Sequence, residues 1–258
     1  MQCFPQLLTG ASSQFPIQKR NDTRTVRNLC WDGREIKLAD PAWSSIEWQL
    51  TFRELVDAEI ASLLEFFVGA EGTLGTFTFL DPTDNLLAWS EKFDEAAWQK
   101  DALLGVSGGV EDRMGSTLAF HVTNPTGAPL RLRQTLNVPG GYYYSLSVWA
   151  RSNAPGEITL VRGSESGRRA VGTGWNRLVF AANSESTETS VAFGIQLAPG
   201  TSIDLYGAQV EAQIGASPYK KTTSAGGVYP ATRFRDNAVA VSMLGPCRHS
   251  CTIHLRTN

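Results

Sequence analysis

The chain has little of several features that mark common classes of protein. Its 258 residues include only 4 cysteines and 3 histidines, and its charges nearly cancel to a formal net charge of -2. Four cysteines over this length are too few for a scaffold held together by disulfides. A net charge this small provides no overall positive field for phosphates, so nucleic acid is not an expected partner.

Long apolar runs are also missing. No stretch approaches the roughly 20 apolar residues that a membrane-spanning helix needs, so we expect no membrane insertion. The N-terminus, Met1 to Pro5, has no basic flank leading into an apolar run. This pattern does not match a cleaved secretion signal, and we expect synthesis in the cytoplasm.

Several motifs of common catalytic sites are absent from the sequence. There is no phosphate loop or paired-histidine zinc motif. His121 falls in a strand pattern, while Gln209 and Glu211 share one face of another expected strand and are interpreted as structural. We therefore predict no catalytic residues and no cofactor, and do not expect an enzyme.

Turn-forming and aromatic residues are plentiful. The sequence has 24 Gly, 12 Pro and 10% aromatic residues, a composition that favours many short strands joined by turns. A mainly β fold is therefore expected.

Residues 1–84 have a mixed pattern. Residues 14–20 and 24–28 are predicted to be strands on either side of a polar turn at 21–23. The basic residues of this hairpin either form a solvated tip or contact an acidic neighbouring subunit. Strict alternation over 45–53 predicts a half-buried strand. Three- and four-residue apolar spacing from Val56 to Phe67 then predicts one amphipathic helix.

Beyond the turn-rich Asp81 to Asn85, the signals are almost entirely those of strands. Expected strands are 117–124, 130–138, 142–151, 157–162, 175–182, 190–197 and 202–213. Such regular spacing is typical of a jelly-roll β-sandwich. After a Thr, Ser and Gly linker at 220–227, the strand-like tail 232–256 is too short for its own core, so we expect it to pack on the N-terminal segment.

The fold predicted is thus a small β-sandwich with one α-helix, interrupted by a jelly-roll β-sandwich. The first domain is discontinuous, residues 1–84 plus 225–258, and the inserted domain spans residues 85–224.

Several segments resemble known families. Phe4 to Leu7, residues 10–17, 24–28 and 77–82 resemble the distal tail proteins of phages and prophages. Asn85 to Leu87, Tyr206 to Glu211 and Ser217 to Tyr219 resemble carbohydrate-binding-like modules attached to phage tail proteins. The first resemblance implies a structural protein of the virion tail tip. Such a protein would form a ring, commonly of six copies, between the tail-tube protein and the tip hub protein.

The candidate sugar-binding residues lie in one expected strand. If Tyr144, Leu146 and Val148 form its apolar face, then Tyr143, Ser147 and Trp149 share the other face with Ser145. An exposed aromatic ring stacks on a sugar while nearby polar groups bond its hydroxyls. Trp149 is either such a platform or is covered by residues 86–98 or by another protomer.

A second candidate cluster lies in the tail. Cys247, His249 and Cys251 have metal-ligand side chains at short spacing, and Cys30 belongs to the same expected domain. The spacing matches no common zinc finger. A metal site, a disulfide formed after release and free thiols all remain open.

Together these features predict a structural tail-tip protein whose module binds host surface polysaccharide. The alternatives are a stand-alone glycan-binding adhesin and an accessory protein of a cell-wall hydrolase.

Overall fold

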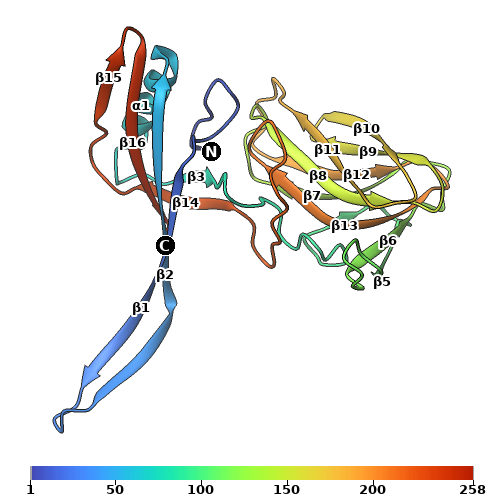
Figure 1. Ribbon diagram of the computed structural model, residues 1–258, viewed down its shortest axis with the longest axis horizontal. Coiled ribbons are helices and arrows are strands. Elements are labelled where there is room, and N and C mark those ends of the chain that lie inside the picture. Colours follow the sequence, from blue (N-terminus) through green and yellow to red (C-terminus); the bar gives the residue numbers. More distant parts are fainter. Residues whose placement is uncertain (1, 258) are drawn as a thin grey trace. The chain divides into compact units, whose positions relative to one another are not determined.

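The computed structural model describes residues 2–257 and, except for residues 41 and 42, their side chains. The described chain is mainly β with a single α-helix, which confirms the predicted fold class (Figure 1). It forms two compact units. The first joins Ser13–Phe79 to the segment ending at Leu7 and the segment beginning at Tyr229. The second combines Leu8–Ser12 with Leu80–Val228, whereas the sequence analysis places the boundaries near residues 84 and 225.

The first unit is built on one six-stranded sheet. Its strands are β1 (Ile17–Leu29), β2 (Glu35–Leu55), β3 (Phe77–Leu80), β14 (Val228–Phe234), β15 (Val241–Gly245) and β16 (Arg248–Thr257). The order is β1-β2-β16-β14-β3, and β15 pairs with β16 at Arg248–Cys251. The C-terminal strand β16 therefore lies beside β2, and Ile253 is opposite Leu50.

The helix α1 (Asp57–Gly69) covers the apolar face of this sheet, as the spacing predicts. The amide of Val56 donates to the carboxylate of Glu59 at 3.1 Å, which satisfies one of the free N–H groups at the helix start. Ile60 and Leu63 join a core that includes Trp48 and Phe52 of β2. The alternation predicted over 45–53 is confirmed, because Trp48, Leu50 and Phe52 are fully buried while Gln49 and Thr51 between them are half-buried.

The prediction of a turn at 21–23 is wrong. β1 continues through these residues, and the chain reverses instead at Cys30–Arg34. Asp32 and Gly33 form this turn: Gly33 has φ 82°, and the Asp32 carboxylate accepts the Arg34 amide at 3.0 Å. β1 and β2 form an arm, residues 24–40, which extends from the rest of the unit (Figure 1).

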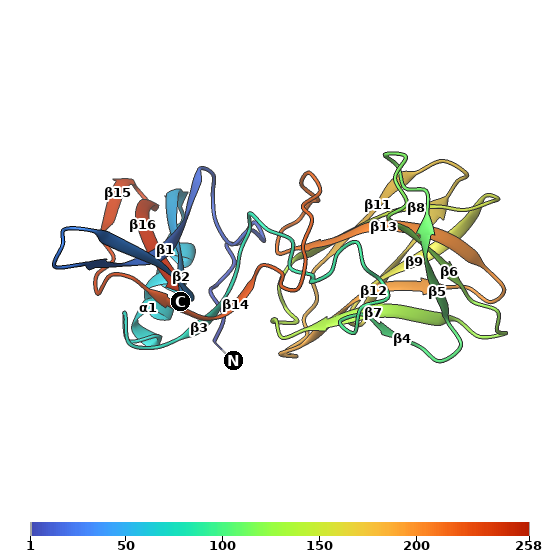
Figure 2. The same ribbon diagram turned by 90° about the horizontal axis from the view of Figure 1, so that it is seen from below.

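The second unit is a sandwich of two five-stranded antiparallel sheets (Figure 2). The β9 sheet has the order β10-β9-β12-β7-β4, and the β8 sheet has the order β11-β8-β13-β6-β5. Their strands are β4 (Gln99–Lys100), β5 (Gly105–Val110), β6 (Ala119–Thr123), β7 (Leu130–Leu136), β8 (Tyr144–Arg151), β9 (Gly156–Arg162), β10 (Glu165–Val171), β11 (Asn176–Ala182), β12 (Val191–Leu197) and β13 (Ser202–Glu211).

The two sheets face each other across an apolar core. Tyr144 of β8 meets Phe193 of β12 edge to face, with ring centroids 5.1 Å apart. Leu146, Leu160 and Ile195 are also buried between the layers. Alternation along each strand then leaves one outer face on each sheet.

No helix of residues 2–257 is long and apolar enough to cross a membrane.

Candidate functional site

The outer face of the β8 sheet carries the strongest candidate site. In β8 the side chains of Tyr144, Leu146, Val148 and Ala150 are all buried in the sandwich core. The alternate side chains, among them Trp149 and Arg151, therefore point outward, as the sequence predicts.

One straight row of side chains crosses this face. The register places Arg151 opposite Asp204, and Asp204 opposite His121. Extending the β11 register by one residue places Trp175 opposite Arg151. Asp204 accepts from Arg151 Nε at 2.9 Å and lies 2.8 Å from His121 Nδ1. The Arg151 guanidinium lies 4.8 Å from the centre of the Trp175 ring, so the carboxylate of Asp204 fixes the arginine that contacts this tryptophan.

The neighbouring row is centred on Trp149. Its register partners are Arg177 and Tyr206. The Arg113 guanidinium, from the loop between β5 and β6, lies 4.0 Å from the centre of the Trp149 ring. Both Trp149 and Trp175 are half-buried, and their indole N–H groups have no hydrogen-bond acceptor among the described residues. Two flat rings thus lie on one sheet face, and the nitrogen atom of each is buried.

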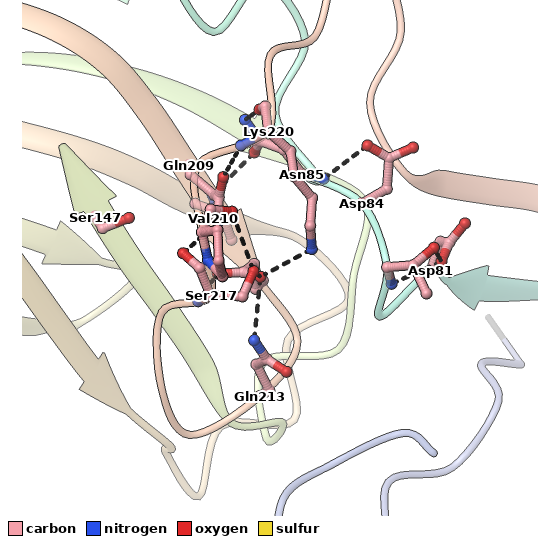
Figure 3. Close-up of polar contacts among 12 residues, drawn as sticks. Asp81, Asp84, Asn85, Ser147, Gln209, Val210, Gln213, Ser217 and Lys220 are labelled. Atoms are coloured by element: carbon pink, nitrogen blue, oxygen red, sulfur yellow. Dashed lines mark hydrogen bonds and ion pairs between the residues drawn. The ribbon is translucent and has the colours of Figure 1, made fainter. Parts of the chain in front are cut away.

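The other end of the face is covered by the segment that follows β13. Glu211 is fully buried and accepts from the amide of Ser217 at 2.9 Å and from Gln213 at 3.1 Å. Gln209 accepts from the amide of Lys220 at 2.6 Å (Figure 3). These contacts fix the segment against the sheet, so this end is not open to a ligand.

Asn85 fastens the start of the unit to the same strand. Its side chain accepts from the amide of Val210 at 3.0 Å and donates to the carbonyl of Ala208 at 2.9 Å (Figure 3). It also donates to the carbonyl of Lys220 at 3.2 Å. The segments whose residues resemble carbohydrate-binding-like modules are therefore in mutual contact.

A buried carboxylate lies under the Trp149 row. Glu91 accepts from the hydroxyl of Tyr206 at 2.9 Å and of Tyr219 at 3.2 Å, and pairs with Lys221 at 2.6 Å. Burial, with the Glu91 hydrogen bond second, raises the pKa of Tyr206 to about 12. Burial also raises the pKa of Tyr219. Both hydroxyls keep their protons at neutral pH and act as fixed donors.

The three predicted sugar-binding residues have different environments. Trp149 lies on the open part of the face. Ser147 is fully buried, and its hydroxyl accepts from Arg177 at 2.9 Å. Tyr143 lies against the segment Leu8–Ser12, where a Cβ added to Gly10 would be 2.6 Å from its ring. Only Trp149 of the three is placed to meet a ligand on this face.

Trp175 is a weaker candidate from sequence, and neither Trp175 nor Arg151 was predicted to lie beside Trp149. Arg151 could have been found, because it follows Trp149 by two residues in the same alternating strand. Trp175 comes into the row only through the pairing of β11 with β8.

The predicted metal cluster is not assembled in the described residues. They contain no group of three or more His, Cys, Asp or Glu side chains that could hold a metal ion. His249 Nε2 lies 2.7 Å from Asp57, and Cys247 hydrogen-bonds the same carboxylate. Cys251 is instead buried in the apolar core, because its strand alternation turns it inward with Ile253 and Leu255.

Comparison with known proteins gives structural likeness alone. No family model matches the chain, and no curated protein matches it. Similar solved structures include the CBM22-1 xylan-binding domain from Paenibacillus barcinonensis Xyn10C, at 16% identity and a TM-score of 0.40, covering 52% of this chain and 97% of that one. TmCBM61 in complex with β-1,4-galactotriose has 14% identity and a TM-score of 0.37, covering 49% of this chain and 97% of that one.

A phage protein is also among these structures. The enzymatically active domain of bacteriophage CBA120 tailspike protein 4 has 16% identity and a TM-score of 0.39, over 52% of this chain. The match covers 22% of that domain's chain. At such scores the likeness carries no argument about the site, which rests on the residues described above.

Proposed function

We propose that the chain is a carbohydrate-binding protein and not an enzyme, and that its second unit binds a glycan at Trp149 and Trp175. The observation that carries the proposal is the placement of two half-buried tryptophans in adjacent rows of one outer sheet face. Indole rings stack on the apolar faces of sugars.

The charged neighbours supply the polar contacts that orient a sugar. Arg151 and His121 are held by Asp204, so their positions are set before a ligand arrives. Arg113 is exposed and has no ion-pair partner among the described residues. It can stack with a bound sugar or move off the Trp149 ring to admit one.

The test is binding of the full chain to an oligosaccharide array, followed by titration calorimetry with the best ligand. We expect Trp149→Ala and Trp175→Ala each to weaken binding about tenfold, since loss of one aromatic contact costs about 1–2 kcal/mol. Phe15→Ala is the control, because Phe15 is an exposed aromatic residue of the first unit outside residues 24–40. Failure of the parent chain to bind any oligosaccharide at millimolar concentration would sink the proposal.

A second candidate function is a ring-forming subunit of a phage tail tip, located in the virion and in contact with tail-tube and hub proteins. The arm of β1 and β2 favours self-association: it is two strands wide, and Ile36, Leu38 and Trp31 on it are exposed. Isolated two-stranded ribbons are marginally stable in water. A second copy of the chain can cover this apolar surface and the unpaired edge of β1.

A further inference from the structure

The outer face of the β9 sheet carries a straight polar row that the tryptophan site does not use. Arg131 lies opposite Gln196, Gln196 opposite Thr159, and Thr159 opposite Arg168. The row therefore crosses four strands, β7, β12, β9 and β10. The next residue along each of the first three strands, Leu132, Ile195 and Leu160, is buried in the core, so the row points outward.

The two arginines at the ends of the row have uncompensated charges. Arg131 Nε donates to the amide oxygen of Gln196 at 2.8 Å, and neither Arg131 nor Arg168 has an ion pair among the described residues. By contrast, Arg133 in the next row is paired with Asp101 at 3.2 Å. Three strand spacings separate Arg131 from Arg168, about 14 Å between backbones. That span suits an extended chain of several sugar units.

A hollow of about 330 Å³ lies along the row. It is lined by Pro129, Glu157, Thr159, Arg168, Gln196, Ala198 and Pro199. Gln196 and Thr159 can donate to and accept from hydroxyl groups, and the exposed carboxylate of Glu157 can accept from them. Hydroxyl-rich polymers offer both kinds of partner.

The face lacks what other polymer ligands require. None of the large apolar side chains that are exposed in the described residues belongs to β4, β7, β9, β10 or β12. Protein interfaces have apolar, often aromatic, centres. Single-stranded nucleic acid is held by stacking of bases on aromatic rings. Polar residues between two free guanidiniums fit neither pattern.

We propose that this face is a second binding site, for an acidic polysaccharide. Carboxylates at two points along the polymer pair with Arg131 and Arg168, and the sugar hydroxyls between them bond Gln196, Thr159 and Glu157. Guanidinium pairs with carboxylate through strong charge-assisted hydrogen bonds. The site is on the opposite sheet from Trp149 and Trp175, so the two faces can hold different segments of glycan independently.

The test measures retention of the full chain on polygalacturonate, with fully methyl-esterified polygalacturonate as the uncharged polymer of the same backbone. We expect binding to the acid alone. Arg131→Gln and Arg168→Gln should each weaken it about tenfold, because each removes a hydrogen bond to a charged group. Arg53→Gln, at an exposed arginine of the first unit outside the arm, is the matched control.

Four results would overturn the proposal. The first is that the parent chain is not retained on polygalacturonate, and the second is that it is retained equally on the methyl ester. The third is that both arginine variants are retained like the parent chain. The fourth is that the parent chain is retained equally on double-stranded DNA. The last would indicate a general polyanion patch. Trp149→Ala separates this site from the proposed tryptophan site, because it should leave retention on polygalacturonate unchanged while weakening binding to neutral sugars about tenfold.

Discussion

Cys247 and Cys251 are four residues apart in sequence but have opposite environments. Cys251 belongs to the apolar core, and burial raises its pKa to about 11. Cys247 is exposed, and its hydrogen bond to Asp57 raises its pKa as well. All four cysteines of the chain are free thiols in this structure. A raised thiol pKa means less reactive thiolate at neutral pH, so both positions should react slowly for different reasons.

Replacement of Asp57 distinguishes the two causes of slow thiol reaction, burial at Cys251 and the carboxylate contact at Cys247. In Asp57→Asn the carboxylate that disfavours the Cys247 thiolate is gone, so the pKa of Cys247 should fall and its labelling by iodoacetamide at pH 8 should accelerate several-fold. The rate at Cys251 should not change, because burial limits it. Peptide mass spectrometry of the labelled protein measures each rate. Glu54→Gln removes a nearby exposed carboxylate and serves as the control; equal Cys247 rates in both variants would contradict the assignment.

At the scale of elements, the loop between β5 and β6 connects local structure to the tryptophan site. Asp112 is buried in it, and its carboxylate accepts from the amides of Met114 at 2.6 Å and Ser116 at 3.2 Å. The backbone reverses through Gly115 at φ 82°. These bonds hold Arg113, which lies between Asp112 and Met114, above the Trp149 ring. Asp112 is therefore a positioning residue.

Loss of this carboxylate should free the loop. We expect Asp112→Ala to increase amide hydrogen exchange in residues 112–116 and to weaken glycan binding a few-fold, because Arg113 is no longer held in place. Asp112→Asn keeps the accepting oxygen and should retain most of the protection and affinity. Unchanged exchange in Asp112→Ala would show that other contacts fix the loop. If Asp112→Asn also binds glycan a few-fold more weakly, the charge of Asp112, and not its hydrogen bonds, positions Arg113.

The same elements show what the sequence could and could not predict. Alternation in β8 predicted the open face of Trp149 because strand periodicity depends on local residues alone. The strand β10 was missed, since Glu165 to Val171 contains glycine and four polar or charged residues at an edge where only one face is shielded. The turn assigned to 21–23 was wrong because polar residues also occupy exposed ribbon strands.

Contacts between distant segments were beyond local patterns. The burial of Ser147 depends on Arg177, thirty residues away, and on the segment near Ser217. The Trp175 row depends on the register of β11 against β8. Neither contact has a periodic signal in the sequence, so local patterns could not predict the cross-strand site or the covered faces.

At the scale of the whole molecule, the two units suit different tasks. The sandwich has a closed core and two polar outer faces, whereas the first unit extends an arm with exposed apolar side chains. Single carbohydrate sites bind weakly: a millimolar dissociation constant corresponds to about 4 kcal/mol. Several copies held together by their arms would convert weak single contacts into strong adhesion, which links self-association to the proposed glycan binding.

The arm provides the last prediction. Val26 lies opposite Leu38, and Asn28 opposite Ile36, so Val26, Leu38 and Ile36 share one face of the ribbon. If this face pairs with another copy, the parent chain should sediment at micromolar concentration as a species heavier than 28.1 kDa. The triple variant Val26→Thr, Ile36→Thr and Leu38→Thr places β-branched side chains suited to strands at all three positions but removes apolar surface. It should therefore sediment as a monomer with an unchanged thermal transition of the sandwich unit.

The matched control places the same kind of change on the other face of the ribbon. Thr25 and Ala39 lie opposite each other there, and Thr25→Ser with Ala39→Ser should leave the assembly intact. A parent chain that remains a monomer at every concentration, with and without an acidic or neutral glycan, would contradict self-association. Parent-like assembly of the triple variant would place the interface elsewhere on the first unit. Because the tryptophan and arginine faces belong to the sandwich, the triple variant should also keep the affinity of each single site while losing retention on a densely coated glycan surface.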